Sequence, residues 1–344
     1  MKFLPILIGL CSAFASSLLA GIELRLPTEN EHLYTNEPEK FYMYVDRYFE
    51  GKKTQPWEGG SFGMVRNAIR HEGQVIMTKF HEGIDVAPLR RDAAGKPLDL
   101  VRCISPGTVV HISPLAGRSN YGKYVVVRHD WEGAAVFSLY AHLAEVHCKP
   151  GDAVTTESVL GILGSTGAGL NRERAHLHLE LTMMMSQRYE DWHKVGGGGV
   201  NYQGLYNGMN LCGTDVARFF LEHRTNPERK FSEFVTSTPV YFKVLAPCQG
   251  VPDFVKRHPW IATAPGESAT SWEISFSATG QPVRFEPGNR PVQTPVITNV
   301  QASSIPHRYL TRNLVSGIRE QATLTNGGRK MISLLMDDFP PVKP

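Results

Sequence analysis

The chain has 344 residues, of which 42% are apolar and 20% are charged, and its formal net charge at neutral pH is +3. This composition is typical of a globular protein and excludes a disordered or low-complexity chain. The small net charge, without any Lys- or Arg-rich run, argues against nucleic acid as a partner.

The first 20 residues have the pattern of an export signal. Lys2 precedes an apolar run over residues 3–10, and small residues follow, which is the order found in a secretory signal peptide. Cleavage is predicted after Ala15 or Ala20. The alternative is an uncleaved membrane anchor, because the segment approaches the ~20 residues that span a bilayer. We therefore predict a signal peptide over residues 1–20 and an exported, periplasmic or secreted protein without a membrane span after cleavage.

Export gives the cysteines a structural interpretation. Signal cleavage removes Cys11, and the four cysteines that remain allow three pairings. Cys103 and Cys148 each end a strand-like run just before a turn, so we favour the disulfides Cys103–Cys148 and Cys212–Cys248. The alternative is four buried free thiols. The sequence has no C-x-x-C pair, which argues against a thiolate zinc site.

Short strand-like segments dominate the middle of the chain. Residues 21–70 are polar and aromatic, and we expect them to wrap around the main domain. Beyond them, β-branched or alternating runs bounded by turn residues predict strands over residues 108–112, 124–129, 135–143, 159–163 and 175–181. Strands at this spacing without long helices indicate an antiparallel, mainly β domain.

The last third of the chain has one helical signal and further strand signals. Residues 215–223 have helical spacing with Asp215 as a possible N-cap, and strand-like pieces recur at 240–244 and 272–276. We therefore predict a main domain over residues 71–225. An extension over residues 21–70 precedes it, and a small β-rich domain of unknown role over residues 226–344 follows it.

Three short segments carry residues suited to metal chemistry, namely residues 81–85, 140–143 and 176–178. His176 and His178 point to one face of their strand, because side chains in a strand alternate. A catalytic zinc site takes three protein ligands and a water. His81 and Asp85 supply two ligands and one histidine of the pair supplies the third, but the spacing does not decide which one.

The histidines that are not ligands have a separate function in this hypothesis. His142 and the remaining member of the pair could move a proton and stabilise an oxyanion. Considered alone, His142 is also compatible with a packed strand histidine.

A helical zinc-protease motif is the competing interpretation of the first segment. His81 and Glu82 followed by Asp85 resemble H-E-x-x-H with aspartate as the last residue, and that motif requires a helix. Gly83 lies inside the segment and Pro88 follows it, and these residues cost ~1 and ~3 kcal/mol in a helix interior. We therefore predict an extended segment, with Glu82 in solvent and without a role.

Residues 80–181 resemble the catalytic domain of lysostaphin-type (LytM-like) zinc endopeptidases. That family carries an H-x-x-x-D element, a Y-x-H-L-like element and a terminal H-x-H, and this chain has all three in the same order. It also has the family's connecting features, Gly107-Thr108-Val109-Val110, Asn120-Tyr121-Gly122 and Gly164-Ser165-Thr166-Gly167.

The resemblance implies roles that the spacing alone leaves open. It makes His81, Asp85 and His178 the ligands of one Zn²⁺ ion, and His142 and His176 the catalytic pair. It also implies an antiparallel β-sheet groove with the metal on its floor.

The resemblance implies, finally, a metalloendopeptidase that hydrolyses peptide cross-links of bacterial peptidoglycan. The alternatives are a catalytically silent cell-wall binding or hydrolase-regulating protein of the same fold, and a general secreted metalloprotease. Two departures from the family, a charged run at residues 172–174 and an extra loop over residues 90–100, leave the substrate preference and the cleaved bond open. The sequence does not predict an oligomeric state.

Overall fold

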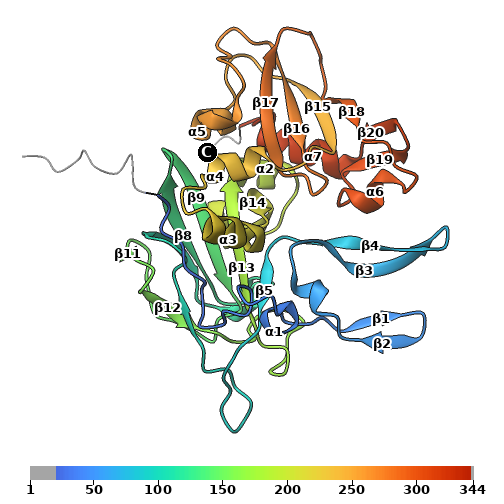
Figure 1. Cartoon of the computed structure of the whole chain (residues 1–344). Helices are drawn as coiled ribbons and strands as arrows, with labels where there is room; N and C mark the ends of the chain where they lie inside the picture. The colour runs from blue at the N-terminus through green and yellow to red at the C-terminus, as the bar shows by residue number, and fades with distance from the viewer. Residues whose placement is uncertain (1–20, 342–344) are drawn as a thin grey trace, which may run out of the picture.

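The computed structural model describes residues 21–341, so the predicted signal peptide over residues 1–20 lies outside the described residues. Figure 1 shows two bodies, one around a large sheet and the other around a smaller sheet near the C-terminus, with two hairpins that project sideways between them. None of the helices within residues 21–341 combines the length and the apolar character needed to cross a membrane.

The first body is built on one antiparallel sheet. Its strands are β5 (Ile84–Val86), β7 (Gly107–Ser113), β8 (Tyr124–Trp131), β9 (Ala134–Ala141), β11 (Ala153–Val154), β13 (Leu177–Met184) and β14 (Leu211–Thr214). They lie in the order β11-β7-β8-β9-β13-β14, and β5 also pairs with β13. The mainly β, antiparallel architecture predicted from the sequence is confirmed.

Smaller elements surround this sheet. A second antiparallel sheet consists of β6 (Leu100–Arg102), β10 (Glu145–Val146) and β12 (Val159–Ile162), and the projecting hairpins consist of β1 (Arg47–Phe49) with β2 (Lys52–Thr54) and β3 (Gly63–His71) with β4 (Gln74–His81). Short helical turns are α1 (Pro38–Phe41), η1 (Trp57–Gly60) and η2 (Ala116–Arg118). Because β3 lies in the predicted extension and pairs with β4, the extension contributes a strand to the main domain.

Helices follow β13 and β14: the first three of them lie between these two strands of the first body, and the last two lead from β14 to the second body. They are α2 (Tyr189–Val195), η3 (Gly204–Tyr206), η4 (Gly208–Asn210), α3 (Val216–Thr225) and α4 (Phe231–Thr236). The predicted helix near residues 215–223 is α3, and its predicted N-cap is confirmed, because the Asp215 side chain accepts a hydrogen bond from the Arg218 backbone N–H at 3.1 Å.

The second body contains a four-stranded antiparallel sheet in the order β17-β16-β15-β18. Its elements are β15 (Phe242–Pro247), α5 (Asp253–Arg257), η5 (Pro259–Ile261), β16 (Ser271–Phe276), β17 (Pro282–Gly288), β18 (Val296–Val300), α6 (His307–Leu310), β19 (Val315–Ile318), β20 (Gln321–Leu324) and α7 (Asn326–Leu335).

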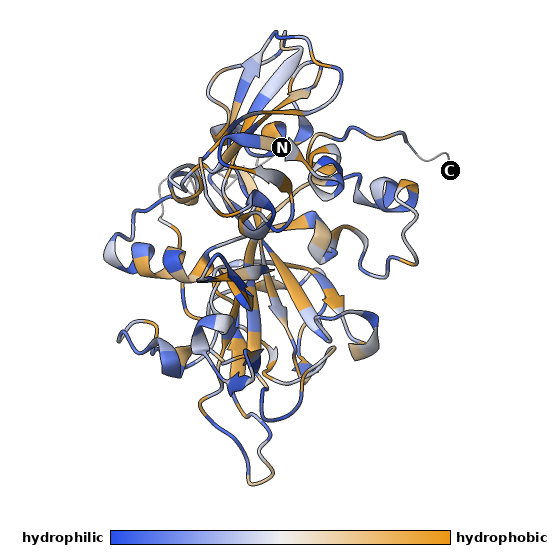
Figure 2. Ribbon diagram, turned by 90° about the vertical axis from the view of Figure 1, so that its right-hand side faces the viewer, coloured by the Kyte–Doolittle hydropathy of each residue, from blue (hydrophilic) through white to orange (hydrophobic). Residues whose placement is uncertain are grey.

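One buried apolar cluster runs through both bodies. It includes Leu179 of β13, Phe219 of α3, Phe234 of α4 and Trp272 of β16, and Figure 2 shows apolar stretches along the strands of both bodies. Arg257 of α5 adds a polar connection, because its terminal nitrogens donate to the carbonyl oxygens of Met184 and Met185, at 2.8 and 2.9 Å, where β13 ends. The sequence-based division near residue 226 stays a prediction.

The four cysteines within residues 21–341 are free thiols, so the predicted disulfides Cys103–Cys148 and Cys212–Cys248 are wrong. The thiol of Cys103 donates to the carbonyl of Ser105 at 3.0 Å. Cys212 belongs to β14 of the first body, whereas Cys248 follows β15 of the second. The turn residues located the ends of strands correctly, but they carry no information about which strand ends meet in space.

Candidate metal centre and active site

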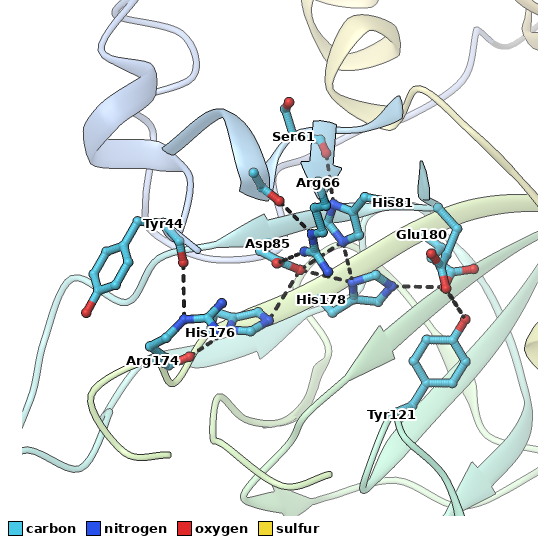
Figure 3. Close-up of polar contacts among 12 residues, drawn as sticks. Tyr44, Ser61, Arg66, His81, Asp85, Tyr121, Arg174, His176, His178 and Glu180 are labelled. Carbon is cyan, nitrogen blue, oxygen red and sulfur yellow. Dashed lines mark hydrogen bonds and ion pairs between the residues drawn. The ribbon is translucent and has the colours of Figure 1, made fainter. Parts of the chain in front are cut away.

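His81, Asp85 and His178 come together where β4, β5 and β13 meet (Figure 3). Asp85 and His178 are direct partners in the antiparallel β5–β13 ladder, and side chains of such partners start from Cβ atoms ~4.5–5.5 Å apart. His81 is the last residue of β4, three positions before β5 begins. The segment is extended, as predicted, and the alternative of a helical zinc-protease motif is excluded.

The three candidate ligand atoms form a nearly equilateral triangle. His81 Nε2 lies 3.1 Å from His178 Nδ1 and 3.1 Å from Asp85 Oδ1, and His178 Nδ1 lies 3.0 Å from Asp85 Oδ1. Ligands bound tetrahedrally to one zinc ion at ~2.0–2.2 Å are separated by ~3.3 Å. The observed triangle is close to that size, and all three residues are buried.

Hydrogen bonds on the outer side of each ring indicate which nitrogen faces the centre. His81 Nδ1 donates to the Ser61 carbonyl at 2.8 Å, and His178 Nε2 donates to Glu180 Oε1 at 2.9 Å. A neutral imidazole has one N–H, so the other nitrogen of each ring presents a lone pair to the Asp85 carboxylate. Three acceptors this close repel one another unless a proton or a metal ion lies among them, and two imidazoles with one carboxylate suit zinc.

Burial and charge act in opposite directions at this centre. Burial opposes the ionisation of Asp85, but the histidines around it, His176 and His81 foremost, hold its pKa well below the ordinary value. Burial disfavours a protonated His178, yet its hydrogen bonds with Asp85 and Glu180 raise its pKa to about 10. Both shifts favour an ionised Asp85 carboxylate beside a cationic group.

His142 and His176 face the same cavity. His176 Nδ1 donates to the Arg174 carbonyl at 2.7 Å and His142 Nδ1 donates to the Thr166 carbonyl at 2.8 Å. Each ring therefore turns Nε2 toward the centre, where His176 Nε2 lies 3.3 Å from Asp85 Oδ1. The two ring centroids are 4.9 Å apart. The structure thus brings all five predicted site residues together.

The backbone of His142 is unusual for a residue that follows a strand. Its φ of 62° lies in the left-handed region, which costs a non-glycine residue ~1–3 kcal/mol and is found preferentially at functional sites. Its backbone N–H donates to the Tyr121 carbonyl at 2.9 Å. Burial, together with the charges of His176 and His178, lowers the pKa of His142 to about 3 and keeps the ring neutral. These features favour a role in the site over simple packing.

Glu180 and Tyr121 lie behind His178, and the sequence analysis gave neither a role. Glu180 follows His178 by two positions on β13, so the two side chains share a face. It is fully buried and accepts hydrogen bonds from His178 Nε2, at 2.9 Å, and from the Tyr121 hydroxyl, at 2.5 Å. The alternation of residues 176, 178 and 180 was the signal that could have identified Glu180.

Replacing Glu180 with glutamine should weaken metal binding 10–100-fold, the usual effect of losing a partner that orients a metal-ligating histidine. Glutamine keeps the size of the side chain but removes the charge that supports the His178 N–H. Competition with a chromogenic chelator measures the affinity. Glu145→Gln, which changes an exposed carboxylate, should bind metal like the unaltered protein, and equal affinities for both variants would contradict the role of Glu180.

Glu82 is half-buried and lines the cavity, so it does not lie free in solvent as predicted, and its lack of a role stays a prediction. Its Oε1 lies 3.4 Å from the Tyr121 hydroxyl. Burial opposes its ionisation, but the charges of His178 and His81 lower its pKa. The segment around Glu82 and Gly83 is packed between β13 and β14 rather than free in solvent, because a Cβ at Gly83 would meet Leu179 and a Cβ at Gly213 would meet Glu82.

Gly83→Ala should lower thermal stability and metal affinity together. An added Cβ would lie 2.3 Å from the Leu179 carbonyl oxygen and 2.8 Å from Glu180 Cγ, and overpacking of this kind costs ~1–3 kcal/mol. The backbone shift would also move the neighbouring His81 and Asp85. Calorimetry and metal titration measure both effects. Gly117→Ala is the matched control, because a Cβ there meets nothing within 4 Å; a Gly83 variant that behaves like this control would refute the close packing.

Arg66 of β3 is a further site residue without a sequence signal. Its terminal nitrogen lies 2.5 Å from Asp85 Oδ2, so it occupies one carboxylate oxygen and leaves Oδ1 directed to the centre. Arg66 and the five site residues line one cavity of about 430 Å³. That volume is within the ~300–1,000 Å³ typical of ligand sites.

The extra loop over residues 90–100 forms hydrogen bonds with the charged run at residues 172–174, which precedes His176. Arg91 donates to the carbonyl oxygens of Arg172, at 2.7 Å, and Glu173, at 3.0 Å, and Arg172 donates to the Ala94 carbonyl at 2.7 Å. The two segments that depart from the family pattern are therefore in contact with each other.

Comparisons with known proteins found a family model and solved structures that are similar to part of this chain. The model of Peptidase family M23 matches residues 79–190. Similar solved structures include the catalytic domain of lysostaphin from Staphylococcus simulans (18% identity, 52% of this chain and 92% of that chain, TM-score 0.29), LytU (21%, 47% and 82%, 0.30) and the catalytic domain of EnpA from Enterococcus faecalis (20%, 40% and 85%, 0.24). No curated protein sequence matches the chain.

The matched segment contains each of the five site residues, the whole of β5, β9 and β13, and the last residues of β4. At these TM-scores the structural likenesses do not bear on substrate or mechanism. Residues 79–190 of this chain are therefore a Peptidase family M23 domain.

Proposed function

We propose that the protein is a zinc-dependent endopeptidase that hydrolyses peptide cross-links of bacterial peptidoglycan. In this proposal His81, Asp85 and His178 hold one zinc ion, and His142 and His176 form the catalytic pair. The main support is that one side-chain atom from each of these three ligands lies 3.0–3.1 Å from the other two. Two further histidines line the same cavity, and each donates its Nδ1–H to a backbone carbonyl.

The side chains of this site would have separate roles in hydrolysis. A bound zinc ion supplies Lewis acidity, which polarises a peptide carbonyl and makes water a nucleophile at neutral pH. His142 and His176 would take the proton from the attacking water and stabilise the charge that develops on the carbonyl oxygen. Glu180 and the Ser61 carbonyl hold the rings of His178 and His81 in the required orientation.

The choice of peptidoglycan is supported by the match to Peptidase family M23 and by the resemblance of residues 80–181 to lysostaphin-type endopeptidases. The export signal predicted at residues 1–20 is consistent with a substrate outside the cytoplasm. We therefore propose a periplasmic or secreted enzyme whose partner is a peptidoglycan peptide.

Digestion of purified peptidoglycan, with muropeptides separated by chromatography, tests this function. The metal-loaded protein should convert cross-linked dimers to monomers, a chelator should stop the reaction, and one equivalent of zinc should restore it. A protein that binds zinc yet leaves all cross-links intact would instead be the silent, wall-binding or regulatory alternative. Comparable hydrolysis of casein would favour a general secreted protease.

A further inference from the structure

Three cationic side chains line one side of the cavity. Arg66, Lys79 and Arg174 share it with the histidines of the metal centre. Figure 3 shows Arg174 at one end of the row of side chains and Glu180 at the other. Arg174 therefore lies at the His176 end of this row, whereas Arg66 lies near its middle beside His81 and Asp85.

The β3–β4 hairpin places two of these cations opposite each other. Arg66 and Lys79 are register partners, and like charges directly opposite in a ladder destabilise it. A register shift between Met64 and Arg66 marks a β-bulge, a feature that re-aims side chains and is frequent beside active sites. Because Arg66 is paired with Asp85, Lys79 is the member of this pair that has no carboxylate partner among the described residues.

Two guanidinium groups are fixed in position through their Nε atoms. Arg66 Nε donates to the Gly59 carbonyl at 2.8 Å, and Arg174 Nε donates to the Tyr44 carbonyl at 3.3 Å. Within residues 21–341 the terminal nitrogens of Arg174 have no hydrogen-bond partner, and neither Arg174 nor Lys79 has a carboxylate at ion-pair distance. A guanidinium held in this way, with free N–H groups, is preorganised to bind a carboxylate.

The acidic residues near Arg174 are already engaged elsewhere. Glu173 accepts a hydrogen bond from the Tyr44 hydroxyl at 3.0 Å. Asp46 accepts one from Gln55 at 3.1 Å and pairs with Lys53 at 3.4 Å. The positive charge of Arg174 is therefore left for a ligand.

We propose that Arg174 and Lys79 bind a carboxylate of the peptide substrate beside the scissile bond. The enzyme then prefers peptides with a free carboxylate beside the scissile bond. Peptides in which that carboxylate is amidated, and uncharged cross-linking peptides such as oligoglycine, are poorer substrates. The inference rests on the proposed endopeptidase function and names its substrate class. Arg66 forms an ion pair with Asp85 and adds positive charge near the bound carboxylate without contacting it. Arg174 and Lys79 determine specificity and take no part in breaking the bond.

Kinetics with matched substrates test the inference. The substrates are a cross-linked peptide dimer with free carboxylates, the same dimer amidated, and pentaglycine. The unaltered enzyme should favour the acid over the amide about tenfold in kcat/KM, the value expected for one charge-assisted hydrogen bond.

Arg174→Gln should raise KM for the acid about tenfold, leave kcat within twofold, and leave the kinetics with the amide unaffected. Arg174→Lys should restore most of the preference, and Lys149→Gln, an exposed control of equal charge change, should keep all of it.

A binding measurement separates this inference from the proposed function. The full-length protein, stripped of zinc by a chelator, is titrated calorimetrically with the acid and amide dimers. One outcome is that the zinc-loaded enzyme hydrolyses no peptide, but the stripped protein binds the acid dimer more tightly than the amide dimer and Arg174→Gln removes that difference. The proposed function then fails and the inference stands. If cross-links are cleaved but acid and amide are treated alike, the function stands and the inference is overturned. Absence of binding by either dimer also overturns it.

Discussion

Replacement of His178 with alanine should abolish both metal binding and hydrolysis. The variant loses one corner of the ligand triangle and leaves Glu180 buried without the His178 N–H that it binds. Losing the Lewis acid removes several kcal/mol of transition-state stabilisation, which corresponds to a rate decrease of at least about 10³-fold. Elemental analysis of the purified protein and turbidity of a cell-wall suspension measure the two effects.

The control for this variant is His147→Ala, which removes an exposed histidine of the same domain. It should retain one metal ion per chain and full activity. Equal activity of the His178 variant and the unaltered protein would contradict the zinc-dependent mechanism proposed for this site. Loss of metal without loss of activity would show that hydrolysis does not use this centre.

Replacement of His142 with alanine should decrease kcat by ~10²–10⁴-fold, the usual contribution of a general acid–base group, while the metal content stays unchanged. His142 does not belong to the ligand triangle, and its ring lies 4.9 Å from that of His176. The separation of kcat from metal content is the expected signature. Single-turnover kinetics and elemental analysis on the same preparation measure it.

Two comparisons make this second expectation specific. His176→Ala should show a similar decrease, and the double variant should lose much less than the product of the two, because residues that act as a unit are not additive. A thermal melt must show that each variant is folded. A His142 variant with unchanged kcat would make it the packed strand histidine that its sequence context also allowed.

The strands of the main domain were predictable because their signal is local. Alternation at residues 176–181 specifies one face of β13, and the family's ordered elements named five residues that the fold brings to one cavity. The extended form of residues 81–85 also followed from local chemistry, since Gly83 and Pro88 disfavour a helix.

The errors concern contacts between segments distant in sequence. The ion pair of Arg66 with Asp85 depends on a bulge in β3 and on the packing of the preceding turn, and neither leaves a periodic pattern. The burial of Glu82 depends on β14, which is more than a hundred residues away in the chain. The cysteine pairing failed for the same reason, because each thiol lies where its own strand places it.

The hydrogen bonds from Arg257 to the end of β13 affect which truncated fragments of this protein can fold. The strand that carries His178 ends on carbonyl groups whose donor comes from the second body, and the apolar cluster continues across the same boundary. An excised fragment limited to the residues matched by the family would leave those carbonyls without their partner and a broad apolar face open to water. In this chain the packing that supports the candidate site therefore extends beyond residues 79–190 and includes part of the second body.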